Sequence, residues 1–200
     1  ALVLANYPNR DGRLGNGVGL DTPASAQGLL QAMAAAGYRI EDMPDDGRAL
    51  IERLAEGPTN ALAGRAAKTG GVRYPLADYR KFFADLPESV QDAVAARWGK
   101  AEVDPFVDGD AFLLPAHRLG NIALCLQPAR GYNIDPASSY HDPDLVPPHG
   151  YLAFYAWLRS GFAAHAIVDM GKHGNLEWLP GKALALSEAC FPEATLGPLP

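Results

Sequence analysis

The 200-residue chain lacks several features that would define its class at once. It has only two cysteines, Cys125 and Cys190, which are far apart and outside the spacings of metal-binding motifs. They indicate buried free thiols in a reducing cytoplasm rather than a disulfide framework. The net charge is −6 and no basic cluster is present, which disfavours nucleic acid as a partner. No apolar run is long enough to span a membrane.

A phosphate-binding loop for ATP is also missing. Gly99-Lys100, Gly171-Lys172 and Gly181-Lys182 all lack the Ser or Thr that follows Lys in the Walker A motif, and the Gly five positions before their own Gly. The chain is therefore not expected to hydrolyse ATP by a P-loop mechanism. It opens on an apolar run without Met or a signal-peptide layout, and it stops in a turn-rich stretch. These ends favour an internal fragment of a larger multidomain subunit.

What the sequence does contain is an alternation of short apolar runs and helical patterns, which predicts an α/β fold with a mostly parallel sheet flanked by helices. Ala1 to Ala5 is a predicted strand, and a glycine-rich loop leads to a helix that Thr22 caps and Gly37 ends. Further helices are predicted at 47–56, 76–85, 88–98 and 151–159, and further strands at 38–43, 112–114, 122–126 and 163–168. Residues 1–200 are predicted to form one α/β segment, with an exposed, flexible connection near 58–75 and a long loop near 128–150.

Most of the chemistry is concentrated between Val168 and Lys182. This stretch follows an apolar run that is short enough to be a buried strand, and ligands in α/β sheets usually bind at the carboxyl ends of strands. His173 and Glu177 are four residues apart, so one helical turn would place them on the same face. Such a pair could hold a metal ion, or accept protons from a ligand while a metal enters. The alternative is a loop histidine and a surface glutamate.

The same stretch carries a family resemblance. Residues 172–182, KHGNLEWLPGK, resemble the signature of the large subunits of tetrapyrrole metal chelatases, the family of CobN and the magnesium chelatase large subunit. Segments that agree with this family occur at residues 5–8 (ANYP), 15–23 (GNGVGLDTP), 127–132 (QPARGY) and 141–151 (HDPDLVPPHGY). The sequences of residues 172–177 and 181–187 are more similar to those of the cobalt enzymes. One departure is Asp169, where members of the family often have His.

The resemblance implies a metal chelatase, a ligase that forms nitrogen–metal bonds. It would insert Co²⁺ into hydrogenobyrinic acid a,c-diamide in cobalamin biosynthesis in the cytoplasm. This chain would hold tetrapyrrole and metal, while AAA+ ATPase partner subunits of the CobS/CobT type hydrolyse ATP-Mg. One alternative is the large (H-type) subunit of magnesium chelatase, which inserts Mg²⁺ into protoporphyrin IX; another is a non-catalytic tetrapyrrole-binding module. A metallohydrolase using His173 and Glu177 is disfavoured because no third ligand is nearby in sequence.

Metal insertion requires a base close to the macrocycle, because two pyrrole N–H protons must leave. Glu177, next to the apolar Trp178 and Leu179, is the predicted base, since burial would raise the pKa of its carboxyl group. His173 is the predicted catalytic partner and, in its neutral form, a metal ligand. Glu177 and Asp169 complete the predicted metal site. Asp169 could instead cap the following turn through its side chain.

Substrate binding is predicted for Arg130, Tyr132, Asn133, Lys172 and Asn16. The planar guanidinium of Arg130 matches a substrate carboxylate, whereas Lys172 could equally be a solvated lysine. Asn16 belongs to the loop Gly15–Gly19, which could cradle an anion at a helix N-terminus or could simply be a tight turn. His141 and Asp142 could ligate a metal, although Asp-Pro pairs such as Asp142-Pro143 more often start turns.

Overall fold

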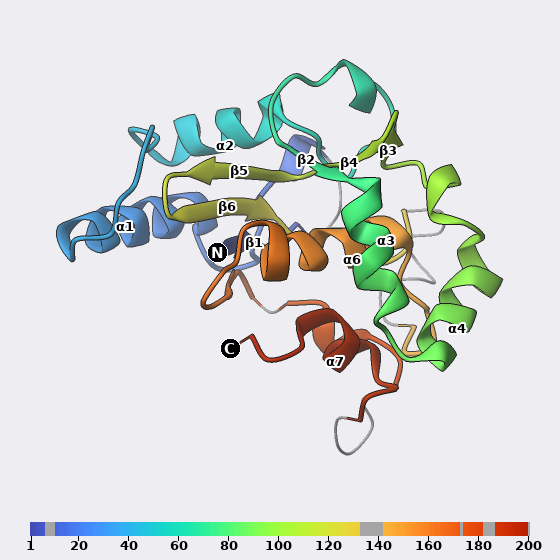
Figure 1. Ribbon diagram of the computed structural model, residues 1–200. Coiled ribbons are helices and arrows are strands. Elements are labelled where there is room, and N and C mark those ends of the chain that lie inside the picture. Colours follow the sequence, from blue (N-terminus) through green and yellow to red (C-terminus); the bar gives the residue numbers. More distant parts are fainter. Residues whose placement is uncertain (7–10, 133–141, 173, 182–186, 200) are drawn as a thin grey trace. The chain divides into compact units, whose positions relative to one another are not determined.

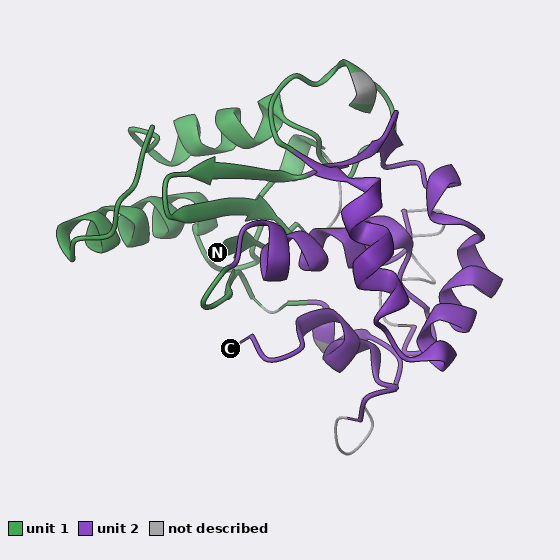
Figure 2. Ribbon diagram, viewed as in Figure 1, with its two compact units in different colours: residues 1–72, 115–128, 164–174 green, residues 73–114, 129–163, 175–200 purple. Residues whose placement is uncertain are grey.

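The computed structural model describes residues 1–6, 11–132, 142–172, 174–181 and 187–199, with the backbone alone at Ala66 and Glu177. Helices and strands follow one another along the chain, so the predicted α/β class is confirmed (Figure 1). The chain forms two compact units (Figure 2). Unit 1 comprises residues 1–72, 115–128 and 164–174, and unit 2 comprises residues 73–114, 129–163 and 175–200.

Unit 1 is built on a four-stranded sheet with the order β5-β6-β1-β7. Its strands are β1 (Leu2–Leu4), β5 (Ala116–Leu119), β6 (Ile122–Leu126) and β7 (Val168–Met170). β1 pairs in parallel with both β6 and β7, while β5 is antiparallel to β6. The sheet is therefore mostly parallel, as predicted, with an antiparallel edge strand that the sequence did not reveal.

Two helices, α1 (Thr22–Ala35) and α2 (Gly47–Glu56), pack against each other and against β1 and β6. The buried leucines between them form the core of unit 1: Leu2, Leu4, Leu30, Leu50, Leu54, Leu124 and Leu126. Asp21, rather than the predicted Thr22, caps α1, because its Oδ1 accepts the Ala24 N–H at 3.0 Å. Asp46 caps α2 in the same way.

Two strand predictions in unit 1 need correction. Residues 38–43 form a loop rather than a strand, because Asp42 has a positive φ of 50° that interrupts an extended backbone. This loop accepts a hydrogen bond at the Arg39 carbonyl from the Asn121 N–H, at 2.9 Å. The strand predicted at 163–168 begins only at Val168 and lies at the edge of the sheet, where Val168 is 43% exposed instead of buried.

The segment near 58–75 was predicted to be exposed, but several of its polar side chains are buried. Asn60, 1% exposed, donates from Nδ2 to the Gln127 carbonyl at 2.9 Å. Thr59, 3% exposed, donates from its hydroxyl to Asp11 Oδ1 at 2.7 Å, and its carbonyl accepts from Arg65 Nη1. These bonds tie the segment, which includes the short turn η2 (Arg65–Ala67), to Gln127 directly after β6 and to Asp11.

Unit 2 is mainly helical, and the helices predicted in its sequence are present. Its elements are β2 (Val72–Pro75), α3 (Leu76–Ala84), α4 (Glu88–Trp98), η3 (Ala101–Val103), β3 (Val107–Asp108), β4 (Ala111–Leu114), α6 (His149–Ala156), η4 (Trp157–Gly161), η5 (Leu176–Trp178) and α7 (Phe191–Leu196). The strands form a sheet with the order β2-β4-β3. Every residue of α6 is buried, and this helix contacts α3, β4 and α7. α6 is therefore the central element of unit 2.

Candidate functional site

The carboxyl edge of the sheet in unit 1 brings three strand ends together. Because β1, β6 and β7 run in parallel, the residues after them emerge at the same edge. Backbone hydrogen bonds continue the pairing beyond the strands, with the Ala5 N–H on the Met170 carbonyl and the Gln127 N–H on the Leu4 carbonyl, both at 2.9 Å. Asn6, Gln127 and Gly171 consequently lie at this edge.

The strand order makes β1 a topological switch point. The chain passes from β1 to β6 on one side of it, and later returns to β7 on the other side. In open α/β sheets, the loops that leave the two strands at such a point are a common place for ligands. Here the loop after β7 begins with Gly171 and Lys172. The binding site predicted from the sequence thus falls beside the switch point, and ligand binding there stays a prediction.

Glycines let these two loops touch. A Cβ atom added at Gly17 would lie 3.2 Å from Gly171 Cα, 3.5 Å from the Lys172 nitrogen and 2.6 Å from Thr22 Oγ1. The residue after Asn16 therefore packs directly against the backbone beside Lys172, and two predicted substrate-binding residues come to the same place. Gly15 and Gly19 have positive φ values of 66° and 83°, so the tight-turn interpretation of this loop holds at both positions.

Asp169 lies at the same edge. It pairs with Val3 in the register of β7 and β1, and its side chain is exposed. Its Oδ2 would be 3.2 Å from a Cβ atom at Gly174, a position that also approaches Gln127 Nε2 at 3.5 Å. Lys172 is exposed as well. Unit 1 thus gathers Asp169, Lys172 and the Asn16 loop around one strand edge.

Asn6 is a residue of this edge that the sequence analysis did not single out. Its side chain is 4% exposed, and neither amide atom has a hydrogen-bond partner within the described part of the chain. The fully buried Thr22 hydroxyl, at the start of α1, is in the same situation. A buried polar group without a partner costs about 1–3 kcal/mol, which a bound polar ligand would recover. In the sequence, the position of Asn6 directly after a predicted buried strand could have indicated this residue as a candidate.

Unit 2 contains the other predicted site residues. η5 carries the backbone of Glu177, so the predicted turn is present, as a 3₁₀ turn. Arg130 is 5% exposed, and its Nη1 donates to the backbone carbonyls of Trp178 and Asp142. The Asp142 carboxylate accepts the Asp144 N–H at 2.9 Å, which is the turn-starting role considered for its Asp-Pro pair.

Tyr132 belongs to a buried polar network of unit 2. Its hydroxyl donates to Asp104 Oδ2, which also accepts the Gly150 N–H at the start of α6 at 2.9 Å. Burial, reinforced by the nearby Asp104 carboxylate, raises the pKa of Tyr132 far above its ordinary value. Burial also raises the pKa of Asp104, because it outweighs the hydrogen bonds that the carboxylate accepts. This network fixes the N-terminus of α6.

His173, Asn133 and His141 lie outside the described residues, and so does the side chain of Glu177. Among the residues that the structure does describe, no group of three or more His, Cys, Asp or Glu side chains is arranged to hold a metal ion. The metal site of His173, Glu177 and Asp169 therefore stays a prediction. Likewise, no helix in the described ranges is long and apolar enough to cross a membrane.

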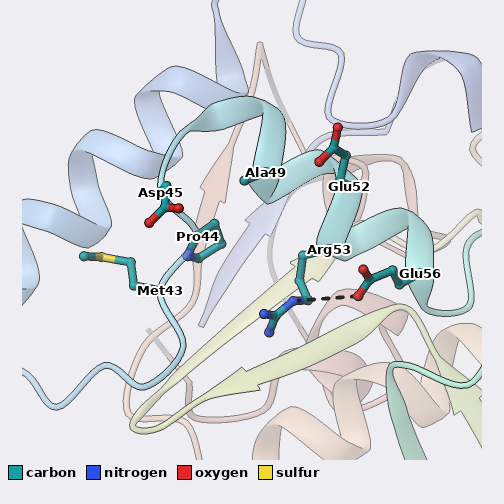
Figure 3. A pocket seen from close by; sticks show the side chains of 7 residues that line it. All are labelled: Met43, Pro44, Asp45, Ala49, Glu52, Arg53 and Glu56. Carbon is teal, nitrogen blue, oxygen red and sulfur yellow. Dashed lines mark ion pairs between the residues drawn. The ribbon is translucent and has the colours of Figure 1, made fainter.

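A separate pocket of about 280 Å³ lies beside α2 (Figure 3). Its walls come from α2 and the residues just before it: Met43, Pro44, Asp45, Ala49, Glu52, Arg53 and Glu56. Arg53 and Glu56 form an ion pair at 3.8 Å across its lining. The pocket contains none of the predicted site residues and no His or Cys side chain.

Both cysteines are free and buried, as predicted from their spacing. Burial raises the pKa of Cys125 to about 12. Cys190 donates from Sγ to the Gly181 carbonyl at 2.8 Å. Neither thiol belongs to the strand edge of unit 1 that gathers Asp169 and Lys172.

Comparisons with known proteins identify the family to which this chain belongs. The sequence model of the CobN/Magnesium Chelatase family matches residues 1–200, and the chain belongs to this family. It is 63% identical over 201 residues to the aerobic cobaltochelatase subunit CobN of Sinorhizobium sp, and 34% identical over 200 residues to the H-type magnesium-chelatase subunit of Rhodobacter capsulatus. Each alignment covers 100% of this chain and 16% of the relative.

A solved structure agrees with the sequence comparisons. The catalytic subunit of cobaltochelatase from Mycobacterium tuberculosis matches with a TM-score of 0.83 and 46% identity, over 100% of this chain and 17% of that one. The chain thus spans about one sixth of the length of these relatives, and its fold is the fold of a segment within a cobaltochelatase catalytic subunit.

Proposed function

We propose that this chain is part of a cobaltochelatase large subunit that inserts Co²⁺ into hydrogenobyrinic acid a,c-diamide during cobalamin biosynthesis in the cytoplasm. The observation that carries the proposal is the level of identity over the whole chain. It is 63% and 52% to two aerobic cobaltochelatase CobN subunits, against 34% to the magnesium-chelatase relative from Rhodobacter capsulatus. Binding of the tetrapyrrole and the metal by this segment is part of the proposal.

The strand edge of unit 1 supports the binding part. It offers an exposed ammonium group at Lys172 for the acid side chains of a corrin, next to the loop that contains Asn16. The buried amide of Asn6 adds a donor and an acceptor that have no protein partner in the described chain. A polar ligand at this strand edge would use groups of both kinds.

Arg130, Tyr132 and Asn133 complete the proposed substrate-binding set. Nη1 of Arg130 and the hydroxyl of Tyr132 already bond to protein groups. Both side chains are also buried, so a substrate could reach them only if the residues around them moved. Asn133 lies outside the described residues.

The chemistry needs a base and metal ligands. When Co²⁺ enters the macrocycle, the two pyrrole N–H bonds break, their electron pairs pass to the metal, and two protons leave. In the proposal, Glu177 accepts these protons and passes them to solvent, while His173 and Asp169 hold the incoming ion. AAA+ partner subunits of the CobS/CobT type bind ATP-Mg and drive the reaction, since this chain has no Walker A motif.

Glu177→Gln tests the catalytic part, because it keeps the shape of the side chain and removes the base. In the complete natural polypeptide with its ATPase partners, we expect Co²⁺ insertion to be abolished and corrin binding to stay nearly intact. Insertion near the wild-type rate would refute the role of Glu177. Absorbance titrations with the corrin diamide and with protoporphyrin IX test the substrate, and tighter binding of protoporphyrin IX would favour the magnesium chelatase alternative.

A further inference from the structure

The turn that carries Glu177 is too short to be stable on its own. η5 consists of Leu176–Trp178, and two hydrogen bonds close it: the Trp178 N–H on the Asn175 carbonyl at 3.2 Å, and the Leu179 N–H on the Leu176 carbonyl at 3.1 Å. Single 3₁₀ turns have poor hydrogen-bond geometry and gain little from cooperativity. The position of this backbone must therefore be set by contacts from elsewhere in unit 2.

The first such contact reaches the start of the turn. Tyr151 donates from its hydroxyl to Asn175 Oδ1 at 2.7 Å, and Asn175 immediately precedes η5. Tyr151 itself is 0% exposed and belongs to α6, the wholly buried helix of unit 2. A rigid phenol on a buried helix has few alternative positions, so this bond fixes the entry to the turn.

The second contact reaches the end of the turn. Arg130 donates from Nη1 to the carbonyl of Trp178, and also to the carbonyl of Asp142 at 3.1 Å. The guanidinium is almost completely buried, and hydrogen bonds from a charged donor are stronger than neutral ones. Leu179, which follows the turn, is 2% exposed and anchors the chain beyond it. Glu177 thus sits on a three-residue turn that is held on both sides.

We propose that Tyr151 and Arg130 are positioning residues for the Glu177 backbone in the insertion reaction. This inference rests on the proposed role of Glu177 as the base. A base must lie within hydrogen-bond reach of the proton that it accepts, and a displacement of about 1 Å can cost about 100-fold in rate. Arg130 therefore contributes through the turn, whether or not it also contacts a substrate carboxylate.

Tyr151→Phe is the primary test, because it removes one hydroxyl and keeps the buried ring. In the complete polypeptide with its ATPase partners, we expect kcat for Co²⁺ insertion to fall about 10- to 100-fold, with KM for the corrin diamide within about twofold of wild type. Hydrogen exchange at the Trp178 and Leu179 amides should become faster. Arg130→Lys, which keeps the charge but loses the planar fork, should lower kcat in the same way.

Tyr79→Phe is the matched control. Tyr79 is also fully buried in unit 2, and its hydroxyl lies 2.7 Å from Nδ1 of His149, the first residue of α6, rather than bonding next to η5. Tyr79→Phe removes a buried hydrogen bond of the same kind, but the kcat of this variant should stay near the wild-type value. Equal losses of kcat in Tyr151→Phe and Tyr79→Phe would reduce Tyr151 to a structural residue, and unchanged exchange at Trp178 and Leu179 would show that the turn is not held there.

These experiments distinguish failure of the positioning role from failure of the proposed function. If Glu177→Gln inserts cobalt normally, the base assignment fails, while the exchange measurement still reports whether Tyr151 and Arg130 hold the turn. If Glu177→Gln is inactive but Tyr151→Phe keeps full kcat, the base assignment stands and the positioning role is refuted. A rise in KM for Arg130→Lys at unchanged kcat would instead indicate direct contact with the substrate.

Discussion

Gly171→Ala is expected to separate the first residues after β1 and β7. A Cβ atom at position 171 would lie 2.3 Å from Ala5 Cβ, whereas carbon atoms in contact are normally about 3.5–4.0 Å apart. The two backbones must therefore move apart by more than about 1 Å, and the bond from the Ala5 N–H to the Met170 carbonyl lengthens. Overpacking of this kind costs about 1–3 kcal/mol.

Amide hydrogen exchange at Ala5 measures this change. We expect its protection to fall in Gly171→Ala, while the Gln127 amide, which bonds to Leu4 on the other side of β1, keeps its protection. Adding Ala5→Gly removes the opposing methyl group, so the double variant should recover most of the lost stability. Wild-type protection in Gly171→Ala, or no recovery in the double variant, would refute the steric explanation.

Gly28→Ala provides the control for the glycine substitution itself. Gly28 lies within α1, and nothing approaches within 4 Å of the position that its Cβ would occupy. Ala in a helix interior is favoured over Gly by about 0.5–1 kcal/mol. We therefore expect Gly28→Ala to stabilise the protein slightly. A destabilised Gly28→Ala would mean that the effect at Gly171 is not specific to the contact with Ala5.

Three further predictions concern single side chains. Because burial raises the pKa of Cys125 to about 12, thiol reagents at about pH 8 should modify it only after unfolding. Burial also raises the pKa of Asp104 above 3.8, so the folded state binds this proton more tightly than the unfolded state. The free energy of unfolding should fall as pH rises from about 4 through the folded-state pKa, and urea titrations of Asp104→Asn should lack this slope. Asp169→Asn should weaken Co²⁺ binding in calorimetric titrations, and unchanged affinity would leave only a turn-capping role.

Elements with a strong local pattern were predictable from the sequence. Pro87 separates two helical patterns, and α3 and α4 lie on either side of it. The apolar runs at 122–126 and at the start of the chain form the two most buried strands of unit 1. In contrast, β5 has the mixed sequence Ala116–Leu119, and its pairing with β6 makes it a strand. The two strands form a hairpin across Gly120-Asn121, a turn sequence that the prediction of strands from apolar runs passed over.

The residues of the candidate site also divide into those that a local pattern places and those that only tertiary contacts place. The location of Asp169 and Lys172 at a strand end was predictable from the apolar run before them, whereas their roles stay predictions. The bond of Tyr151 was not predictable, since its partner Asn175 is 24 residues away and no local pattern connects them. Arg130 was predicted from its chemistry alone, and its bond to the Trp178 carbonyl spans 48 residues. Such contacts depend on the packing of α6 and η5, which the sequence does not display.

The parallel pairing of β1 has a consequence for synthesis on the ribosome. Leu2 pairs with Leu124 and with Val168, so β1 waits during synthesis for partners that follow about 120 and 165 residues later. At about 5–20 residues per second, the second partner appears roughly 10–30 s after β1. During that interval Leu2, Val3 and Leu4 form an apolar segment with unpaired backbone groups. The nascent chain should therefore be a substrate for chaperones that bind extended hydrophobic segments.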